Sequence, residues 1–162
     1  MVIEKEARIL SYKKDFTLRV MQIKRYVAIQ KMLSKYIQHG KTTVYTHSRN
    51  VAYLSYIIAR FCERKFKINI NYDFLVVGAM FHDFFLYDWH VSEGRPRLHG
   101  FNHPNIASIN AKKFFDINEK QKEIIETHMW PLTITKFPKT VEAKIVCLAD
   151  KLCSTRETIH RF

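Results

Sequence analysis

The most constraining feature of the sequence is an apolar stretch, residues 74–81, that ends in the polar pair His82-Asp83. A helix that is apolar on every side must be buried on most of its faces. Adjacent residues on a helix point about 100° apart, so both polar side chains face solvent only if the helix ends there or borders a cavity. Burying a carboxylate without a partner is costly, so Asp83 needs a cation. The pair alone indicates either a hydrogen-bond network at a helix end or a metal site.

The composition restricts the fold class. Four glycines and four prolines in 162 residues are too few for the many turns of a β-sandwich, whereas 47% hydrophobic residues suffice for a packed core. The length is that of one domain. We therefore predict a single all-α domain.

The charge and the cysteines restrict the setting. With 27 basic and 15 acidic residues the net charge is +12, which favours anionic partners such as nucleotides or nucleic acids, although solvated helix faces account for many basic residues equally well. The three cysteines form no ligand-like pair, and no apolar run approaches the ~20 residues of a membrane span. Charged residues crowd the first positions, so a secretory signal is not expected. A cytoplasmic protein with no membrane partner is the expectation; its oligomeric state is left open.

Apolar residues recur at helical spacing along most of the chain. We predict helical structure over 9–37, in one or two segments, with Gly40 as its stop. A second helix is predicted to begin between residues 42 and 46 and to run through Phe61, with His47 and Phe61 on its inward face. Asp73 is a suitable N-cap for the apolar helix 74–83. The polar stretch 87–101 is predicted to be a loop over the site.

Three further helices follow the loop. One begins at Asn102-His103-Pro104, since proline is tolerated in a first turn. The next opens with a capping box formed by Asn118 and Gln121, reaches His128 and is stopped by Pro131. The last follows Thr140 and has Ile145, Leu148 and Leu152 on one inward stripe.

Six polar residues lie at the ends or on the inward faces of these predicted helices: His47, His82, Asp83, His103, His128 and Asp150. Imidazole and carboxylate are the ligand set of Zn, Mn, Fe, Co or Ni. Several histidines with one carboxylate able to bridge suit two metal ions a few Å apart.

The order of these residues resembles the H…HD…D signature of the HD-domain metal-dependent phosphohydrolases. Their flanking segments are also similar to the ligand helices of that superfamily: Thr46-His47-Ser48-Arg49-Asn50-Val51-Ala52, Gly78-Ala79-Met80-Phe81-His82-Asp83 and Leu148-Ala149-Asp150-Lys151. The similarity covers about residues 43–157. The chain departs from the cyclic-di-GMP phosphodiesterase branch, because Phe84-Phe85-Leu86 follows the doublet and no GYP triplet occurs.

The resemblance implies a bundle of five or more helices, with residues 43–157 as the metal-binding core and residues 1–40 as a helical extension. It implies that His47, His82, Asp83 and Asp150 hold one ion. His103 and His128 stand where two-metal members carry additional histidines, and Asp83 would then bridge both ions. His99 is better explained as a loop histidine near phosphate.

A metal-dependent phosphohydrolase is therefore expected, in which a metal-activated hydroxide attacks phosphorus in an ester or anhydride of a small anionic, nucleotide-like substrate. Two divalent ions are expected. Fe or Mn is favoured over Zn, Co, Ni or Mg. The candidate catalytic residues are Asp83, Asp88 and Lys151. Arg49, Arg95 and Arg97 are candidates for holding phosphate oxygens. Asp88 would orient water or protonate the leaving group, but it is equally explained as a turn residue. Lys151 and the three arginines are also explained as residues of solvated surfaces.

Two other hypotheses compete with the enzyme. A non-catalytic metal-containing module would use the positive charge to bind or sense a nucleotide or RNA. A purely structural bundle would have to satisfy six buried polar residues with hydrogen bonds alone. Because every ligand position of the resemblance is filled, the enzyme is favoured.

Overall fold

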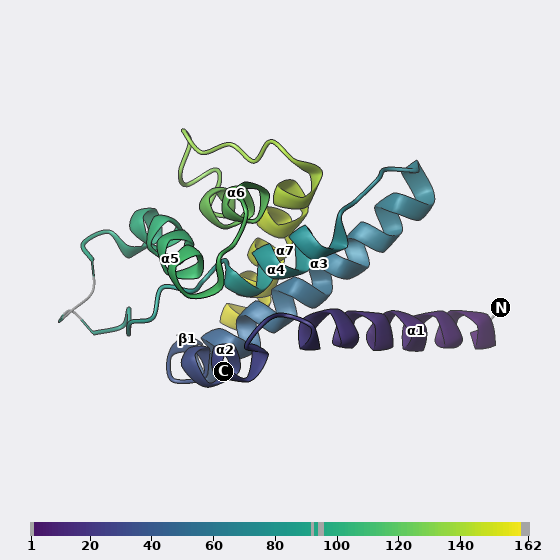
Figure 1. Cartoon of the computed structure of the whole chain (residues 1–162), viewed down its shortest axis with the longest axis horizontal. Coiled ribbons are helices and arrows are strands. Elements are labelled where there is room, and N and C mark those ends of the chain that lie inside the picture. The colour runs from purple at the N-terminus through teal and green to yellow at the C-terminus, as the bar shows by residue number, and fades with distance from the viewer. Residues whose placement is uncertain (1, 92, 94–95, 160–162) are drawn as a thin grey trace.

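The computed structural model describes residues 2–91, 93 and 96–159 of the chain. Within these residues it contains seven helices and one two-stranded hairpin (Figure 1). In chain order these are α1 (Val2–Met21), α2 (Tyr26–Leu33), β1 (Ile37–His39), β2 (Thr42–Thr43), α3 (Val44–Phe66), α4 (Tyr72–Phe81), α5 (His99–Phe115), α6 (Glu119–Thr127) and α7 (Val141–Ile159). The prediction of a single all-α domain is confirmed.

Helix α4 forms the centre of the bundle, as its apolar sequence predicts. It packs against α3, α6 and α7, and most of its residues from Leu75 to Phe81 are buried. The predicted cap was wrong by two positions. Asn71 accepts hydrogen bonds from the backbone N–H groups of Asp73 and Phe74, while Asp73 forms an ion pair with Arg19 of α1 at 2.9 Å. Asn71 has the extended backbone that directs a side-chain acceptor at the first turn.

The N-terminal segment forms two helices, which the prediction allowed, but its helical structure ends before Ile37 and is not stopped by Gly40. Its second helix ends at Leu33, and residues 37–43 form an antiparallel hairpin. Gly40 has a φ of 57° and lies in the turn of this hairpin, a conformation that glycine adopts without steric cost. Glycine thus ends a strand here rather than a helix. The hairpin leads directly into α3, whose N-cap is Thr43.

The buried faces of α3 and α7 agree with the prediction only in part, since His47 and Ile145 are buried but other residues of the predicted stripes are not. Phe61 on α3 and Leu148 and Leu152 on α7 are each about half exposed, at 50%, 51% and 50%. The buried stripes instead contain small residues: Ala52, Ser55 and Ala59 on α3, and Ala143, Ala149 and Cys153 on α7. Small side chains allow helix axes to approach closely, which favours the burial of these positions.

The remaining helix boundaries show one further correction. Helix α5 begins at His99, three residues before the predicted start, and Pro104 lies inside it. The predicted capping box is confirmed, since Asn118 and Gln121 cap the first turn of α6 reciprocally. That helix ends at Thr127, before Pro131, and α7 follows Thr140 as predicted.

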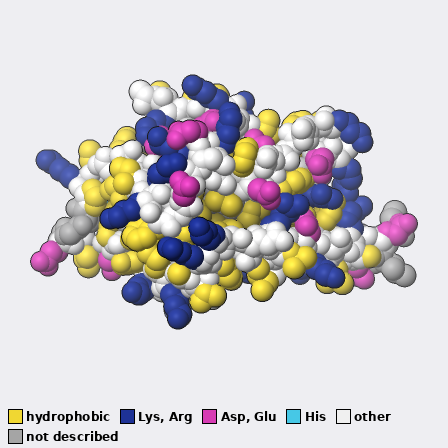
Figure 2. All heavy atoms as spheres, in the orientation of Figure 1, with side chains coloured by type: hydrophobic (Ala, Val, Ile, Leu, Met, Phe, Trp, Pro, Cys, Tyr) yellow, Lys and Arg dark blue, Asp and Glu magenta, His cyan; other side chains and the backbone are white. Residues whose placement is uncertain are grey.

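On the face in Figure 2, Lys and Arg side chains are distributed over the whole outline rather than gathered into one patch. Such a distribution is typical of solvated helix faces. None of the helices in the described part of the chain is long and apolar enough to cross a lipid bilayer.

Candidate metal centre

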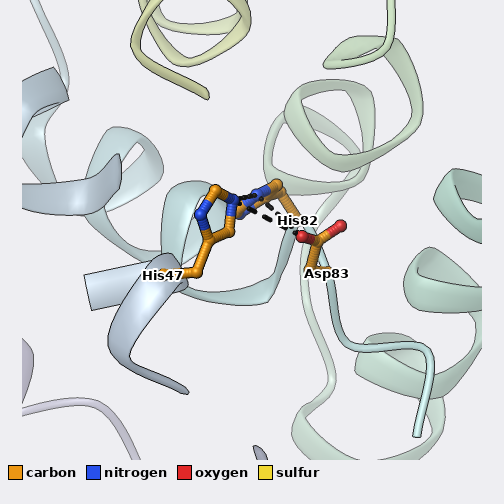
Figure 3. A group of neighbouring side chains, drawn as sticks. All are labelled: His47, His82 and Asp83. Carbon is orange, nitrogen blue, oxygen red and sulfur yellow. Dashed lines mark hydrogen bonds and ion pairs between the residues drawn. The ribbon is translucent and has the colours of Figure 1, made fainter. Parts of the chain in front are cut away.

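The bundle brings together all six residues that the sequence predicts as metal ligands, and all six are buried. His47 projects from α3 towards the end of α4, where His82 and Asp83 lie (Figure 3). The other three come from separate helices: His103 from α5, His128 from the end of α6, and Asp150 from α7. His82 and His128 are C-caps, so two helix ends with partial negative charge face the site and favour a cation there.

One group of ligand atoms surrounds Nε2 of His47 and Nε2 of His82, which are 3.3 Å apart. Oδ1 of Asp150 lies 3.2 Å from the first nitrogen and 3.6 Å from the second. Oδ2 of Asp83 lies 3.6 Å and 3.3 Å from them, respectively. Each of the two nitrogens thus lies within 3.6 Å of an oxygen from both carboxylates, and imidazole and carboxylate ligands so placed can hold one divalent ion.

A second group lies on the other side of Asp83. Its Oδ1 atom is 3.2 Å from Nε2 of His103 and 3.7 Å from Nε2 of His128, and these two nitrogens are 2.9 Å apart. Among the described residues, no donor makes a hydrogen bond with acceptable geometry to Asp83 Oδ1, although this atom is buried. The two oxygens of one carboxylate thus face two different histidine pairs.

The opposite ring nitrogens fix the histidine tautomers. Nδ1 of His82, His103 and His128 lies 2.8, 3.0 and 2.6 Å from the carbonyl oxygens of Ala79, His99 and Ile125, respectively. A carbonyl oxygen only accepts, so each Nδ1 carries a proton and each neutral ring presents an Nε2 lone pair to the centre. His47 donates likewise to the carboxylate of Glu157 at 2.8 Å. Lone pairs facing each other at 2.9–3.3 Å cannot form a hydrogen bond without another proton, and a cation satisfies them all.

Without a bound ion, the buried carboxylates and histidines shift one another's pKa values. Burial favours the neutral forms, but the facing histidines hold the pKa of Asp83 and of Asp150 well below the ordinary range. Burial would also lower the pKa of His47, yet its bonds to Asp150 and Glu157 raise it to about 9. Burial, together with the charges of His82 and His103, lowers the pKa of His128 to about 3. Burial would lower the pKa of His82 as well, but Asp83 and Asp150 raise it well above its ordinary value. Without an ion the carboxylates are thus ionised and His128 is neutral, while His47 and His82 are protonated. A metal bound here would replace the protons on those two rings, so its binding would release protons.

Three residues that the sequence analysis did not assign support the ligands. Gln38 on β1 donates to Asp83 Oδ2 at 2.7 Å, Ser154 donates to Asp150 Oδ1 at 3.2 Å, and Glu157 holds His47. The helical spacing of positions 150, 154 and 157 was a usable signal, because it places three polar side chains on one face of α7. No local pattern marks Gln38, which reaches the site only through the hairpin.

A cavity of about 610 Å³ opens onto the ligands. Trp89, His99 and His103 form a stack beside it, with ring centroids 5.2 and 4.6 Å apart. Pro131 and Leu132 contribute apolar surface, while the ammonium group of Lys151, which also lines the cavity, donates to His128 O at 2.8 Å. The cavity therefore offers an aromatic and apolar wall next to a polar floor.

Most of the other predicted site residues lie elsewhere. The exposed carboxylate of Asp88 accepts a hydrogen bond from the backbone N–H of His90, as a turn residue does. Arg49 and Arg97 are exposed and are not among the described residues that line the cavity. Arg95 lies outside the described residues. Of the predicted catalytic and substrate-binding residues that the structure describes, only Asp83 and Lys151 border the cavity.

The ligand atoms meet the requirements of a divalent metal site. Three overlapping groups have one ligand atom per residue, all within 4.8 Å of one another: His47, His82 and Asp83; His82, His128 and Asp150; and Asp83, His103 and His128. Their nitrogen and oxygen donors, without thiolates, suit Mn, Fe, Co, Ni or Zn. Open space beside the ligands permits a water molecule or a substrate to approach.

Comparison with known proteins gives one match. A family model described as HD domain matches residues 44–155, which is more than half of the chain. No curated protein sequence and no solved structure matches the chain significantly. The matched segment begins at the first residue of α3 and includes all six candidate ligands.

Proposed function

The chain belongs to the HD-domain family, and from this premise we propose that it is a metal-dependent phosphohydrolase that cleaves a phosphate ester or anhydride. The observation that carries the proposal is the set of four histidine Nε2 atoms gathered around the two oxygens of Asp83. Because Nδ1 of each ring is bonded elsewhere, Nε2 is the atom that each ring offers to a metal, and imidazole with carboxylate is a good ligand set.

We further propose that the site holds two ions. His47, His82, Asp83 and Asp150 would hold one of them, and His103, His128 and Asp83 the other. The distances support this division, because Oδ2 of Asp83 faces the first pair of histidines and Oδ1 the second. Bound divalent ions supply Lewis-acid chemistry, since they lower the pKa of water and neutralise charge on a phosphoryl group. Mn or Fe is preferred by the mixed imidazole and carboxylate donors.

The residues of the chain position the substrate. Lys151 borders the cavity beside Asp150, where its ammonium group can bind a phosphate oxygen. Trp89 and Leu132 line the same cavity and provide surface for the leaving group, such as the base of a nucleotide. A volume of about 610 Å³ accommodates a small phosphorylated molecule. Asp88 and the exposed arginines have no part in this proposal.

The test combines metal analysis with an activity screen. The purified protein is loaded with Mn²⁺ or Fe²⁺, its metal content is measured, and hydrolysis of nucleotides and generic phosphoesters is assayed. We expect bound metal and release of phosphate or nucleotide. Asp83→Asn should lose metal and activity, because the substitution removes the charge from the shared ligand. Asp73→Asn is the matched control, since this aspartate lies at the start of the same helix with an exposed side chain.

Two outcomes would contradict different parts of the proposal. A wild-type protein that takes up no metal would refute the site itself. A metal-loaded protein that hydrolyses none of the phosphoesters would refute the enzyme, and tight nucleotide binding by that protein would then identify a binding module.

A further inference from the structure

The hairpin of β1 and β2 lies outside the segment matched by the family model, yet it reaches the candidate metal centre. Its base is joined to α3 by a hydrogen bond from Val44 N to Tyr36 O at 2.9 Å. On strand β1, the ring of His39 contacts the ring of His47 edge-on, with centroids 5.8 Å apart. The N-terminal segment therefore contributes to the wall of the site as well as to the core.

Gln38 is the hairpin residue that enters the site. Its side chain is 8% exposed, and Nε2 donates to Asp83 Oδ2 at 2.7 Å, the short distance of a bond to a charged acceptor. The orientation of the amide follows from chemistry, because the reverse orientation would place two oxygen acceptors in contact. Gln38 Oε1 is buried and makes no hydrogen bond within the described part of the chain, so Asp83 alone determines how the amide is held.

A carboxylate that serves two ions must be held in one orientation. Rotation about the bond to its carboxyl carbon would let both oxygens of Asp83 turn towards the same pair of histidines. Oδ2 receives a hydrogen bond from Gln38 while Oδ1 receives none, so the contact with Gln38 fixes one oxygen and leaves the other facing His103 and His128.

We propose that Gln38 is a positioning residue that holds Asp83 in the bridging orientation and thereby makes the second metal position available. The inference depends on the proposed two-ion site and extends it to a residue outside the matched domain. Groups that orient metal ligands typically change metal affinity by about 10–100-fold. The effect should fall on the ion held by His103 and His128, because that position loses Oδ1 when the carboxylate turns.

The experiment measures metal binding directly. Metal-free wild-type protein and Gln38→Met are titrated with Mn²⁺ by calorimetry, and electron paramagnetic resonance detects coupled spins of neighbouring ions. Methionine has a similar length and no hydrogen-bond donor. We expect two ions and a coupled spectrum for the wild type. For the variant we expect the weaker affinity to fall about 10–100-fold and the coupled spectrum to disappear at the same Mn²⁺ concentration, while the tighter affinity changes little.

Gln30→Met is the matched control, since this glutamine is exposed on α2 in the same N-terminal segment, and it should bind metal like the wild type. Gln38→Asn, whose amide is one methylene shorter, should also lose the second ion and serves if the methionine variant does not fold. The inference would be overturned if a folded Gln38 variant bound two coupled ions with the same affinities as the wild type. Failure of the wild type itself to bind two ions would instead refute the two-ion site.

Discussion

At the scale of single residues, the candidate centre depends on which nitrogen of each histidine is protonated. Backbone carbonyl oxygens accept from Nδ1 of His82, His103 and His128, so the fold itself fixes these tautomers. His47 is the exception, because its Nδ1 donates to the carboxylate of Glu157. An anionic partner makes an imidazole a stronger ligand than a carbonyl partner does.

Glu157→Gln tests this difference. Without a bound ion, the pKa of His47 should fall from about 9, because one of the carboxylates that raise it is removed. Metal affinity should fall by roughly 10–100-fold. Nuclear magnetic resonance titration of the histidine rings measures the first effect and calorimetry with Mn²⁺ the second. Glu142→Gln, at the opposite end of α7, is the control. An unchanged pKa of His47 together with unchanged metal affinity would show that Glu157 does not act on His47.

At the scale of helices, small residues decide how closely the elements approach the site. Gly78 on α4 faces Ile124 on α6, and a Cβ atom at position 78 would lie 2.6 Å from Ile124 Cγ2 and 2.8 Å from its Cβ. The isoleucine cannot swing away easily, because it is β-branched and fully buried in its own helix. Ile124 lies one turn before His128, so this contact also sets the position of a candidate ligand.

Gly78→Ala should therefore destabilise the protein by about 1–3 kcal/mol despite the better helix propensity of alanine. Urea denaturation measures the change. The double variant Gly78→Ala/Ile124→Ala is the control, and its loss should be smaller than the sum of the two single losses because the clash is relieved. Additive losses would show that the close contact does not limit the packing of α4 on α6.

Helix α1 is attached to the bundle by a charged network. Asp15 accepts hydrogen bonds from Tyr56 of α3 at 2.6 Å and from Arg19 at 3.0 Å, and Arg19 pairs with Asp73 of α4. Burial raises the pKa of Asp15, but these two partners together lower it below the ordinary 3.8. Since the folded pKa is depressed, this stabilisation is present above the unfolded value and is lost as the pH falls through the folded one.

Asp15→Asn should lower the free energy of unfolding by about 0.5–1 kcal/mol at neutral pH, a modest value because the carboxylate is partly exposed and screened. The difference from the wild type should shrink below about pH 4. Urea denaturation across the pH range measures it. Asp116→Asn, at an exposed pair with Lys112, should show no such loss. A difference that persists at low pH would mean that the charge of Asp15 is not its source.

At the scale of the whole molecule, the candidate ligands join elements that are distant in sequence. His47 and Asp150 are 103 residues apart, and the six ligands come from five helices. A cation bound here would connect these helices. It would also offset the charge of the two buried carboxylates and bind the histidine nitrogens that face one another. Metal binding and folding should therefore be coupled.

Removal of metal should lower the melting temperature. At a free metal concentration of about 100 times the dissociation constant, one ion contributes about 2.7 kcal/mol, or roughly 5–10 °C for a chain of this size. Calorimetric melting with and without a chelator measures the change, and adding back Mn²⁺ should reverse it. Asp83→Asn provides the control, since its melting temperature should respond far less to chelation. Equal melting curves for chelated and loaded wild-type protein would contradict the coupling.

The fold class, the central helix and the candidate ligands could all be predicted from the sequence. Scarce glycine and proline, helical periodicity and a polar pair after an apolar run are local properties, and His47, His82, Asp83 and Asp150 carry a recognisable order. The capping box at Asn118 and Gln121 was equally predictable, because it is built from neighbouring residues.

Which helix faces are buried, and which residues surround the ligands, depends on how the helices pack. Leu148 and Leu152 satisfy the helical period but remain half exposed, whereas Ala143, Ala149 and Cys153 on the same helix are buried. Asp88 follows the polar pair closely in sequence yet turns to the surface, whereas Gln38 is distant in sequence and reaches Asp83 across the bundle. Contacts between distant segments depend on how whole elements pack, and no local pattern encodes that.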